Sequence, residues 1–179
     1  MTLTVLRDGT YHKKPWKNGG GITEDVWVLP DASSQDDFDI RLSLATIDRD
    51  GPFSAFPGID RTITLVGGDP FVLDFGNGHQ HRMEMLQPFS FDSSLTPSSK
   101  LILGPSRDFN VMTRSGRWRH EVRVLDKSMS GIDLTPSTIA IIHMAIGSST
   151  IRAVKQASLS KRDTALIRQA EHLQVELEP

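Results

Sequence analysis

A run of three glycines near the amino terminus is surrounded by side chains that could bind a ligand. Trp16, Lys17 and Asn18 precede the glycines at 19–21, and Glu24 follows them. Glycine permits positive φ and close backbone approach, while an aromatic ring, a cation, an amide and a carboxylate supply more chemistry than a plain turn needs. Phosphate binding is disfavoured, because no Lys-Ser/Thr follows the run and no G-x-G-x-x-G opens a helix. A flexible connector anchored by the Trp is the alternative interpretation.

A second candidate surface lies in the segment 38–47, which has the alternation of a β-strand. Its even positions from Phe38 to Leu44 are apolar, and this face is expected to lie between two sheets. The opposite face carries Arg41 followed by the small side chains Ser43 and Ala45. A single guanidinium beside small residues is typical of a cavity wall, and an ordinary exposed polar face is the alternative.

The segment 109–114 offers a third set of side chains. Its alternation places Asn110, Met112 and Arg114 on one face, opposite Phe109 and two other residues. An amide, a thioether and a guanidinium on the same face are more typical of a ligand pocket than of a packed core.

The elements that must position these side chains are predicted to be strands. Short segments with period-two alternation or β-branched side chains recur, separated by turn-forming residues. This pattern predicts an all-β sandwich or barrel with few or no helices. The expected strands are at 26–29, 38–47, 61–66, 71–75, 79–86, 89–91, 109–114, 121–125, 139–146 and 150–154. The stretch 165–178 is ambiguous, because its apolar side chains also form a helical stripe.

Four segments in a fixed order resemble one protein family. They are WKNGGGITE at 16–24, RLSLATI at 41–47, GPFSAFPGIDR at 51–61 and DFNVMTR at 108–114. Together they resemble the HutD/Ves family of bacterial cupin-like proteins, closely over residues 10–125 and only in pattern beyond. Lys17 stands where the family commonly has Arg, which keeps the charge but loses the planar fork.

The resemblance implies a bicupin, in which one chain forms two small β-barrels or jelly-roll-like sandwiches. Residues 1–127 would form the amino-terminal half with the family motifs, and residues 128–179 would complete the carboxy-terminal half. The stretch 128–136 would connect the halves, and 165–178 would be a terminal hairpin with a strand at 173–177. A weak internal echo agrees with this, since strands ending in Gly67 and Gly147 each precede a returning strand.

In the family pattern Arg41 and Arg61 are both motif positions, and together with Asn110 they would make a carboxylate receptor. A planar guanidinium matches a carboxylate through two parallel, charge-assisted hydrogen bonds. For Arg61, a salt bridge to Asp50 or Asp60 at the turn is the alternative.

The remaining residues of the expected site surround these polar groups. Trp16 and Phe53 would supply an aromatic wall. Glu24 would orient one arginine or accept a hydrogen bond from a ligand nitrogen. The predicted ligand-binding set is therefore Trp16, Asn18, Glu24, Arg41, Ser43, Phe53, Arg61, Asn110 and Met112.

A metal site at His79, His81 and Glu84 is the competing hypothesis, because cupin enzymes commonly use an H-x-H pair and a Glu. In a regular strand Glu84 lies on the face opposite the two histidines. The pair also follows Gly76-Asn77-Gly78, which predicts a solvent-exposed hairpin tip. We therefore expect neither a metal nor another cofactor.

Composition narrows the class of protein. The chain has 179 residues, a net charge of −2 and no cysteine, which suits one domain or two small fused modules. A charge this small gives no general attraction for nucleic acid or anionic lipid. No apolar run has the length of a membrane span and the start lacks a signal-peptide core, so a cytoplasmic location is expected. A homodimer is compatible with the sequence.

The expected function is that of a non-catalytic or weakly catalytic cupin that binds a small carboxylate-bearing metabolite. Resemblance to HutD implies regulation of histidine utilisation, with urocanate or a formylated glutamate derivative as ligand, whereas Ves is associated with environmental stress. A metal-free isomerase or lyase with Glu24 as the base is the alternative. An interaction module with a filled barrel is a third hypothesis.

Overall fold

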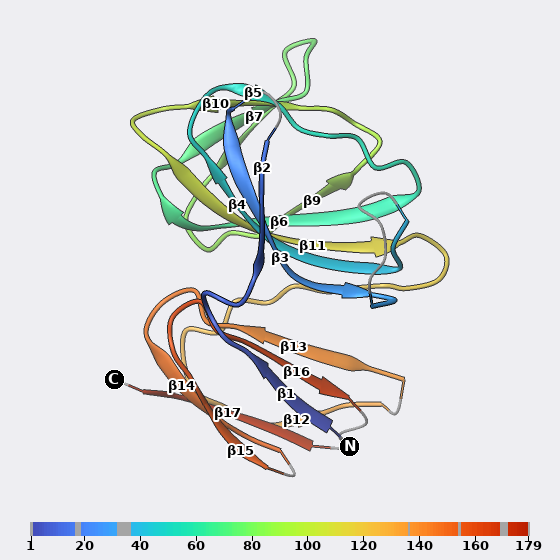
Figure 1. The fold of residues 1–179 in the computed structure, drawn as a ribbon, viewed down its shortest axis with the longest axis vertical. Helices are drawn as coiled ribbons and strands as arrows, with labels where there is room; N and C mark the ends of the chain where they lie inside the picture. Colours follow the sequence, from blue (N-terminus) through green and yellow to red (C-terminus); the bar gives the residue numbers. More distant parts are fainter. Residues whose placement is uncertain are drawn as a thin grey trace. The chain divides into compact units, whose positions relative to one another are not determined.

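The computed structural model describes residues 2–16, 19–31, 37–135, 137–153, 155–168 and 172–178, and their side chains except at 129–133 and 172. These residues form β-strands and no helix, which confirms the all-β prediction (Figure 1). In the described part of the chain no helix is long and apolar enough to cross a lipid bilayer. The strands are β1 (Thr2–Leu6), β2 (His12–Pro15), β3 (Gly21–Leu29), β4 (Ile40–Ile47), β5 (Gly51–Pro52), β6 (Ile59–Gly68), β7 (Phe71–Asp74), β8 (Gln80–Met83), β9 (Phe89–Asp92), β10 (Ser98–Leu101), β11 (Ser106–Arg114), β12 (Met129–Asp133), β13 (Ile139–His143), β14 (Ser148–Arg152), β15 (Gln156–Leu159), β16 (Thr164–Arg168) and β17 (His172–Glu178).

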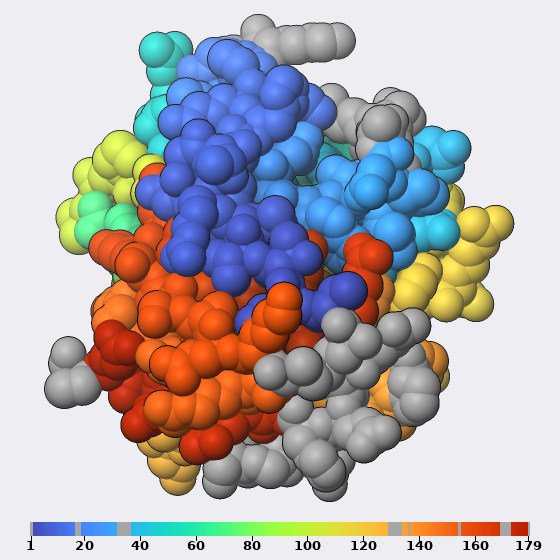
Figure 2. Space-filling model, turned by 60° about the horizontal axis from the view of Figure 1, so that its bottom comes forward, coloured from blue at the N-terminus to red at the C-terminus, as the bar shows by residue number. Residues whose placement is uncertain are grey.

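The strands belong to two units of unequal size. The large unit is His12–Val124, and the small unit combines Met1–Tyr11 with Leu125–Pro179. The predicted halves, 1–127 and 128–179, differ from these units at the amino terminus. The first residues join the carboxy-terminal segment because β1 pairs with β16, from Thr2↔Arg168 to Leu6↔Thr164. In Figure 2 the dark-blue start of the chain accordingly lies beside orange and red residues.

The large unit consists of two antiparallel sheets. One has the strand order β2-β3-β4-β11-β6-β9, and the other has the order β5-β10-β7-β8. Their shared core contains Ile47 and Ile63 from the first sheet and Phe71 and Leu73 from the second. Because Ile47 lies on the same face of β4 as Arg41, the arginine-bearing face is the one between the sheets. The expectation that the other, wholly apolar face would lie there is wrong, although that face is buried as well.

The small unit also consists of two sheets, with the orders β1-β16-β13 and β12-β17-β14-β15. Apolar side chains from both sheets, including Ile167 and Val175, form its core. The expected strand at 173–177 is confirmed as part of β17. The expected terminal hairpin is wrong, because β16 and β17 pair in different sheets. The expected connector at 128–136 contains β12, which pairs with β17.

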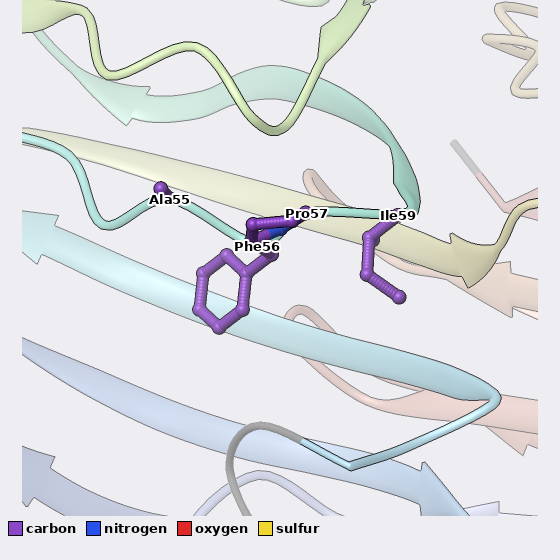
Figure 3. A pocket seen from close by; sticks show the side chains of 4 residues that line it. All are labelled: Ala55, Phe56, Pro57 and Ile59. Carbon is purple, nitrogen blue, oxygen red and sulfur yellow. The ribbon is translucent and has the colours of Figure 1, made fainter.

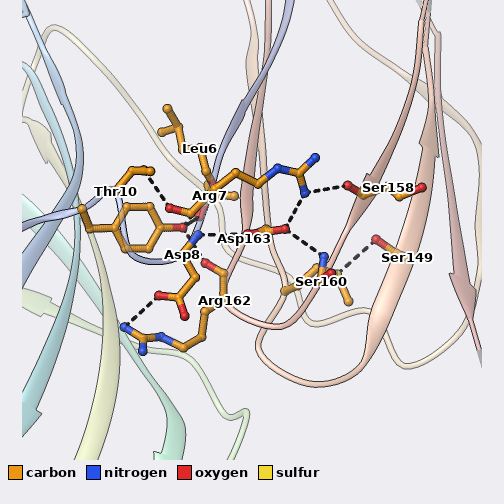
Figure 4. Close-up of polar contacts among 12 residues, drawn as sticks. Leu6, Arg7, Asp8, Thr10, Ser149, Ser158, Ser160, Arg162 and Asp163 are labelled. Carbon is orange, nitrogen blue, oxygen red and sulfur yellow. Dashed lines mark hydrogen bonds and ion pairs between the residues drawn. The ribbon is translucent and has the colours of Figure 1, made fainter.

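The carboxylate of Asp163 forms hydrogen bonds that connect the residues after β1 to the rest of the small unit (Figure 4). Asp163 accepts hydrogen bonds from Arg7 Nη1 at 2.6 Å, from the Asp8 amide at 2.9 Å and from the Ser160 amide at 3.0 Å. These bonds outweigh the effect of burial and hold the pKa of Asp163 below its ordinary value. The turn after β1 is thereby tied to the turn between β15 and β16.

Two local predictions had opposite outcomes. The hairpin at Gly76-Asn77-Gly78 is confirmed, because β7 pairs with β8 and Asn77 has a φ of 50°. The expected strand at 121–125 is wrong. Glu121 and Arg123 pair with each other at 2.7 Å instead, and both are exposed.

Candidate functional site

Five of the expected site residues lie on one face of three adjacent strands. The register aligns Arg41 of β4, Met112 of β11 and Arg61 of β6 in one row across the sheet. The next row contains Ser43 and Asn110. Paired residues in an antiparallel sheet point to the same side, so these side chains share the face that looks into the large unit. All five are buried.

Arg41 is oriented by a carboxylate that the sequence interpretation did not include. Its Nε and Nη2 donate to Asp25 Oδ1 at 2.8 and 2.7 Å, and Lys14 Nζ contacts Asp25 Oδ2 at 2.8 Å. Burial alone would raise the pKa of Asp25, but the bond from Lys14 and the charge of Arg41 lower it below its ordinary value. The guanidinium carbon of Arg41 lies 6.0 and 5.8 Å from the ring centres of Phe38 and Phe56.

Arg61 is oriented by a neutral amide. Its Nε and Nη2 donate to Asn110 Oδ1 at 2.9 and 2.5 Å. A guanidinium has no acceptor, so the amide oxygen must face it and the amide nitrogen must face the other way. Asn110 Nδ2 donates to Oδ1 of Asp108, a fully buried carboxyl. The guanidinium carbon of Arg61 lies 4.8 and 5.3 Å from the ring centres of Phe53 and Phe91.

The buried charged groups of the interior carry more positive than negative charge. Burial lowers the pKa of Arg61 to about 10, Asp108 opposes that shift and Arg41 adds to it, so Arg61 stays charged at neutral pH. Burial raises the pKa of Asp108 to about 7, against the effects of Arg61 and Asn110. Neither arginine donates a hydrogen bond from Nη1 to any residue that the structure describes. Both guanidiniums therefore keep donor capacity for a ligand.

Glu24 lies on the opposite face from the two arginines. In the register of β3 with β4, Glu24 pairs with Leu44, whereas Asp25 pairs with Ser43. Glu24 instead lies 3.7 Å from Lys13. Glu24, which was predicted to belong to the site, therefore does not lie with the two arginines. Asp25 is the carboxylate beside Arg41.

The glycine run connects β2 to β3. Trp16 donates from Nε1 to Thr23 Oγ1 at 2.7 Å and packs against the core that contains Phe53. Gly19 has a φ of 67°, a backbone conformation that glycine adopts readily. A Cβ on Gly21 would lie 2.1 Å from the carbonyl oxygen of Thr46. Asn18, which was expected in the site, and Lys17 lie outside the described residues.

A small pocket lies beside the motif loop that precedes β6 (Figure 3). It has a volume of about 150 Å³ and is lined by Ala55, Phe56, Pro57 and Ile59. The side chains of Phe56 and Ile59 point to the same side of the loop in Figure 3. Because the Phe56 ring also contacts the Arg41 guanidinium, this pocket adjoins the arginine-bearing interior.

His79, His81 and Glu84, the residues of the competing metal-site hypothesis, each have other contacts or surroundings. The His81 ring stacks on Phe89 with a centroid distance of 3.6 Å, and His79 lies at the exposed hairpin tip. Glu84 accepts a hydrogen bond from Arg82 at 2.5 Å. In the described part of the chain, no three His, Asp or Glu side chains gather as a set of metal ligands.

Several interior residues were not predicted from the sequence. Asp108 has the same strand parity as Asn110 and Met112, so extending the predicted strand at 109–114 by one residue would have found it. Nothing in the local pattern distinguishes Asp25 from its neighbour Glu24. The residues missed are Lys14, Asp25, Phe38, Phe56, Phe91 and Asp108.

Comparisons with known proteins agree with this architecture. A family model described as HutD matches residues 8–179. Protein Ves from Citrobacter koseri is 38% identical over 131 residues, which cover 73% of this chain and 68% of that protein. Protein Ves from Escherichia fergusonii is 35% identical over 116 residues, which cover 64% of this chain and 60% of that protein.

Solved structures of similar proteins cover almost the whole chain. HutD from Pseudomonas fluorescens SBW25, determined in a formate condition, is 26% identical with a TM-score of 0.65, and the match covers 98% of both chains. A conserved protein of unknown function from Pseudomonas aeruginosa PAO1 is 21% identical with a TM-score of 0.71, over 99% of this chain and 94% of that one. The second similarity shows a shared fold.

Proposed function

Because this chain belongs to the HutD family, we propose that the interior of its large unit is a receptor for a small carboxylate-bearing metabolite. One observation carries the proposal, namely the row of Arg41, Met112 and Arg61 across three strands. Two arginines on one buried face are costly unless something neutralises them. A ligand carboxylate would accept hydrogen bonds from the Nη1 groups that the described residues leave unused.

The partners of the two arginines favour an anion over a neutral ligand. Arg41 shares Asp25 with Lys14, so that cluster retains a positive charge. Arg61 is oriented by an uncharged amide, and the nearby Asp108 has a pKa close to neutrality. Flanking aromatic rings exclude water and strengthen the attraction for an anion. Planar guanidiniums suit the planar carboxylate group.

The family supports a more specific role. HutD of Pseudomonas fluorescens was determined in a formate condition, and formate is itself a carboxylate. We infer a cytoplasmic regulator of histidine utilisation with urocanate or a formylated glutamate derivative as its ligand. The two units, each of two sheets, would be the two cupin barrels of a bicupin. The stress-related role associated with Ves rests on sequence identity to Protein Ves. An isomerase or lyase with Glu24 as base has lost its support, because Glu24 lies on the other face.

The proposal is tested by calorimetric titration with urocanate, N-formylglutamate and the corresponding amides. Acids should bind and the amides should bind much more weakly, because an amide is uncharged and offers the guanidinium donors one acceptor oxygen where a carboxylate offers two. Arg41→Gln or Arg61→Gln should weaken binding at least tenfold, since loss of one partner of a desolvated charged pair costs about 2–5 kcal/mol. Arg82→Gln, on the exposed face of β8, is the matched control. Equal affinity for acids and amides would overturn the carboxylate assignment.

A further inference from the structure

Asp108 is a buried carboxyl with one unsatisfied oxygen. Its side chain is fully buried, Oδ1 accepts the bond from Asn110, and Oδ2 has no hydrogen-bond partner among the described residues. Buried polar atoms are normally paired, and a buried carboxylate with an orphan oxygen is especially costly. Since Arg61 forces the orientation of the Asn110 amide, Oδ1 must accept, and Oδ2 is the oxygen on which a proton can reside.

Few charged groups face Asp108. On β6 its cross-strand neighbour is Leu65, and Arg61 lies further along the same face. On β4 its neighbour is Ala45, and Arg41 lies further along. The sheet packed against this face contributes apolar side chains, Phe71, Leu73 and Met83. Asp25 forms ion pairs with both Arg41 and Lys14.

We propose that Asp108 takes up one proton on Oδ2 when a carboxylate binds beside Arg61, so that ligand binding by the large unit is coupled to protonation. This inference rests on the proposed function. The proton comes from solvent, and the only bond formed is the O–H bond. The cause is electrostatic, because a ligand carboxylate neutralises Arg61 and places a second negative charge near Asp108 in a poorly solvated interior.

The unliganded protein is poised for this change. Burial raises the pKa of Asp108 to about 7, and the positive charge of Arg61 and the hydrogen bond from Asn110 keep it from rising further. Removing the effect of Arg61 by pairing it with a ligand therefore raises this pKa above neutrality. The free protein is partly ionised at Asp108 near pH 7, whereas the complex is protonated there.

His81 is the other titratable group whose effect on the pH dependence of binding must be distinguished from that of Asp108. It stacks on Phe89, whose cross-strand neighbour on β6 is Ile63. Burial and the neighbouring His79 lower the pKa of His81 below its ordinary value. A protonated His81 would also favour an anion at low pH, so a His81→Phe variant is needed beside Asp108→Asn.

Calorimetry of the wild-type protein with N-formylglutamate and with acetate tests the coupling without any variant. Titrations near pH 8 in two buffers of different ionisation enthalpy count the protons taken up, and a value approaching one per ligand is expected. From about pH 7 to about pH 9 the dissociation constant should rise towards about tenfold per pH unit. Infrared difference spectra should show a protonated-carboxyl band appearing on binding.

The decisive comparison is between the wild type and Asp108→Asn, because an asparagine accepts the hydrogen bond from Asn110 and mimics the protonated acid. This variant should bind the probe with little pH dependence above pH 6 and should lack the infrared band. His81→Phe and Asp60→Asn, an exposed position on β6, should keep the wild-type proton count. Binding without proton uptake in the wild type, or loss of the uptake in His81→Phe alone, would overturn the inference and leave the receptor intact. Failure of both acids to bind would overturn the receptor and the coupling together.

Discussion

At the scale of single residues, each interior arginine is held in the same way by different chemistry. Arg41 donates through Nε and Nη2 to a carboxylate, and Arg61 donates through the same two atoms to an amide. Each guanidinium also lies against two phenylalanine rings. Fixing a side chain before the ligand arrives lowers the entropy lost on binding. The orienting residues Asp25 and Asn110 therefore matter for affinity although they need not touch the ligand.

A comparison of Asp25→Asn with Glu24→Gln tests this assignment. Asp25→Asn removes the charge paired with two cations and should cost about 1–3 kcal/mol in the free energy of unfolding. It should also weaken N-formylglutamate binding several-fold, because Arg41 loses its fixed orientation. Glu24→Gln, on the opposite face, should leave affinity unchanged. Chemical denaturation and calorimetry measure both quantities.

The difference in stability between the wild type and Asp25→Asn should depend on pH with a definite sign. The folded-state pKa of Asp25 is lowered, so its contribution to stability is complete above its ordinary value of 3.8 and is lost as the pH falls through the lowered value. Wild type and Asp25→Asn should therefore converge in stability at acid pH. A difference that grows on acidification would contradict the role given to Asp25.

At the scale of elements, the connection between β2 and β3 shows why glycine is needed. Trp16 closes the turn with two backbone hydrogen bonds, from its own amide to the Gly21 carbonyl at 2.9 Å and from Gly19 to its carbonyl at 3.0 Å. Gly19 has positive φ, and Gly21 packs directly on the backbone of β4 at Thr46. The glycines thus serve two distinct purposes within one segment.

Single alanine substitutions separate these purposes. Gly19→Ala should cost about 1 kcal/mol, because a Cβ disfavours positive φ although the space around it is open. Gly21→Ala should cost more, because its Cβ would collide with the Thr46 carbonyl oxygen and force β3 away from β4. Thermal unfolding gives the order of stability, wild type above Gly19→Ala above Gly21→Ala. Equal or higher stability in both variants would mean that the segment is only a linker.

At the scale of the whole molecule, the chain begins in one unit and returns to it at the end. β1 supplies an edge strand to the small unit, and His12–Val124 then forms the large unit before the chain returns. Without β1 the strand β16 would have an unpaired edge. The Asp163 bonds to Arg7 and Asp8 hold this strand to its unit.

Asp163→Ala should weaken the small unit selectively. The change leaves two backbone amides without their acceptor and removes the carboxylate partner of Arg7, which should cost about 2 kcal/mol or more. Hydrogen exchange should accelerate in β1 and β16 and stay unchanged in β4, β6 and β11. Asp126→Ala, at an exposed position of the same unit, is the control. Uniform acceleration over both units would show that the effect is not confined to the small unit.

The sequence by itself determined what depends on local alternation. Period-two patterns predicted the all-β class, and the turn residues Gly76-Asn77-Gly78 predicted the hairpin of β7 and β8. They also put Arg41 with Ser43 and Asn110 with Met112, because strand parity follows from the pleat alone. The ordered motifs pointed to the family that the match over residues 8–179 then showed.

Only the tertiary structure decided which strands pair and which residues meet across them. The bulge between Asp25 and Trp27, and the register of β3 on β4, bring Asp25 and not Glu24 to Arg41. The pairing of β1 with β16 brings the first strand beside residues 164–168. The packing of the second sheet makes the arginine-bearing face of β4 an interior one. Such pairings arise from burial summed over distant segments, so no local window of sequence contains them.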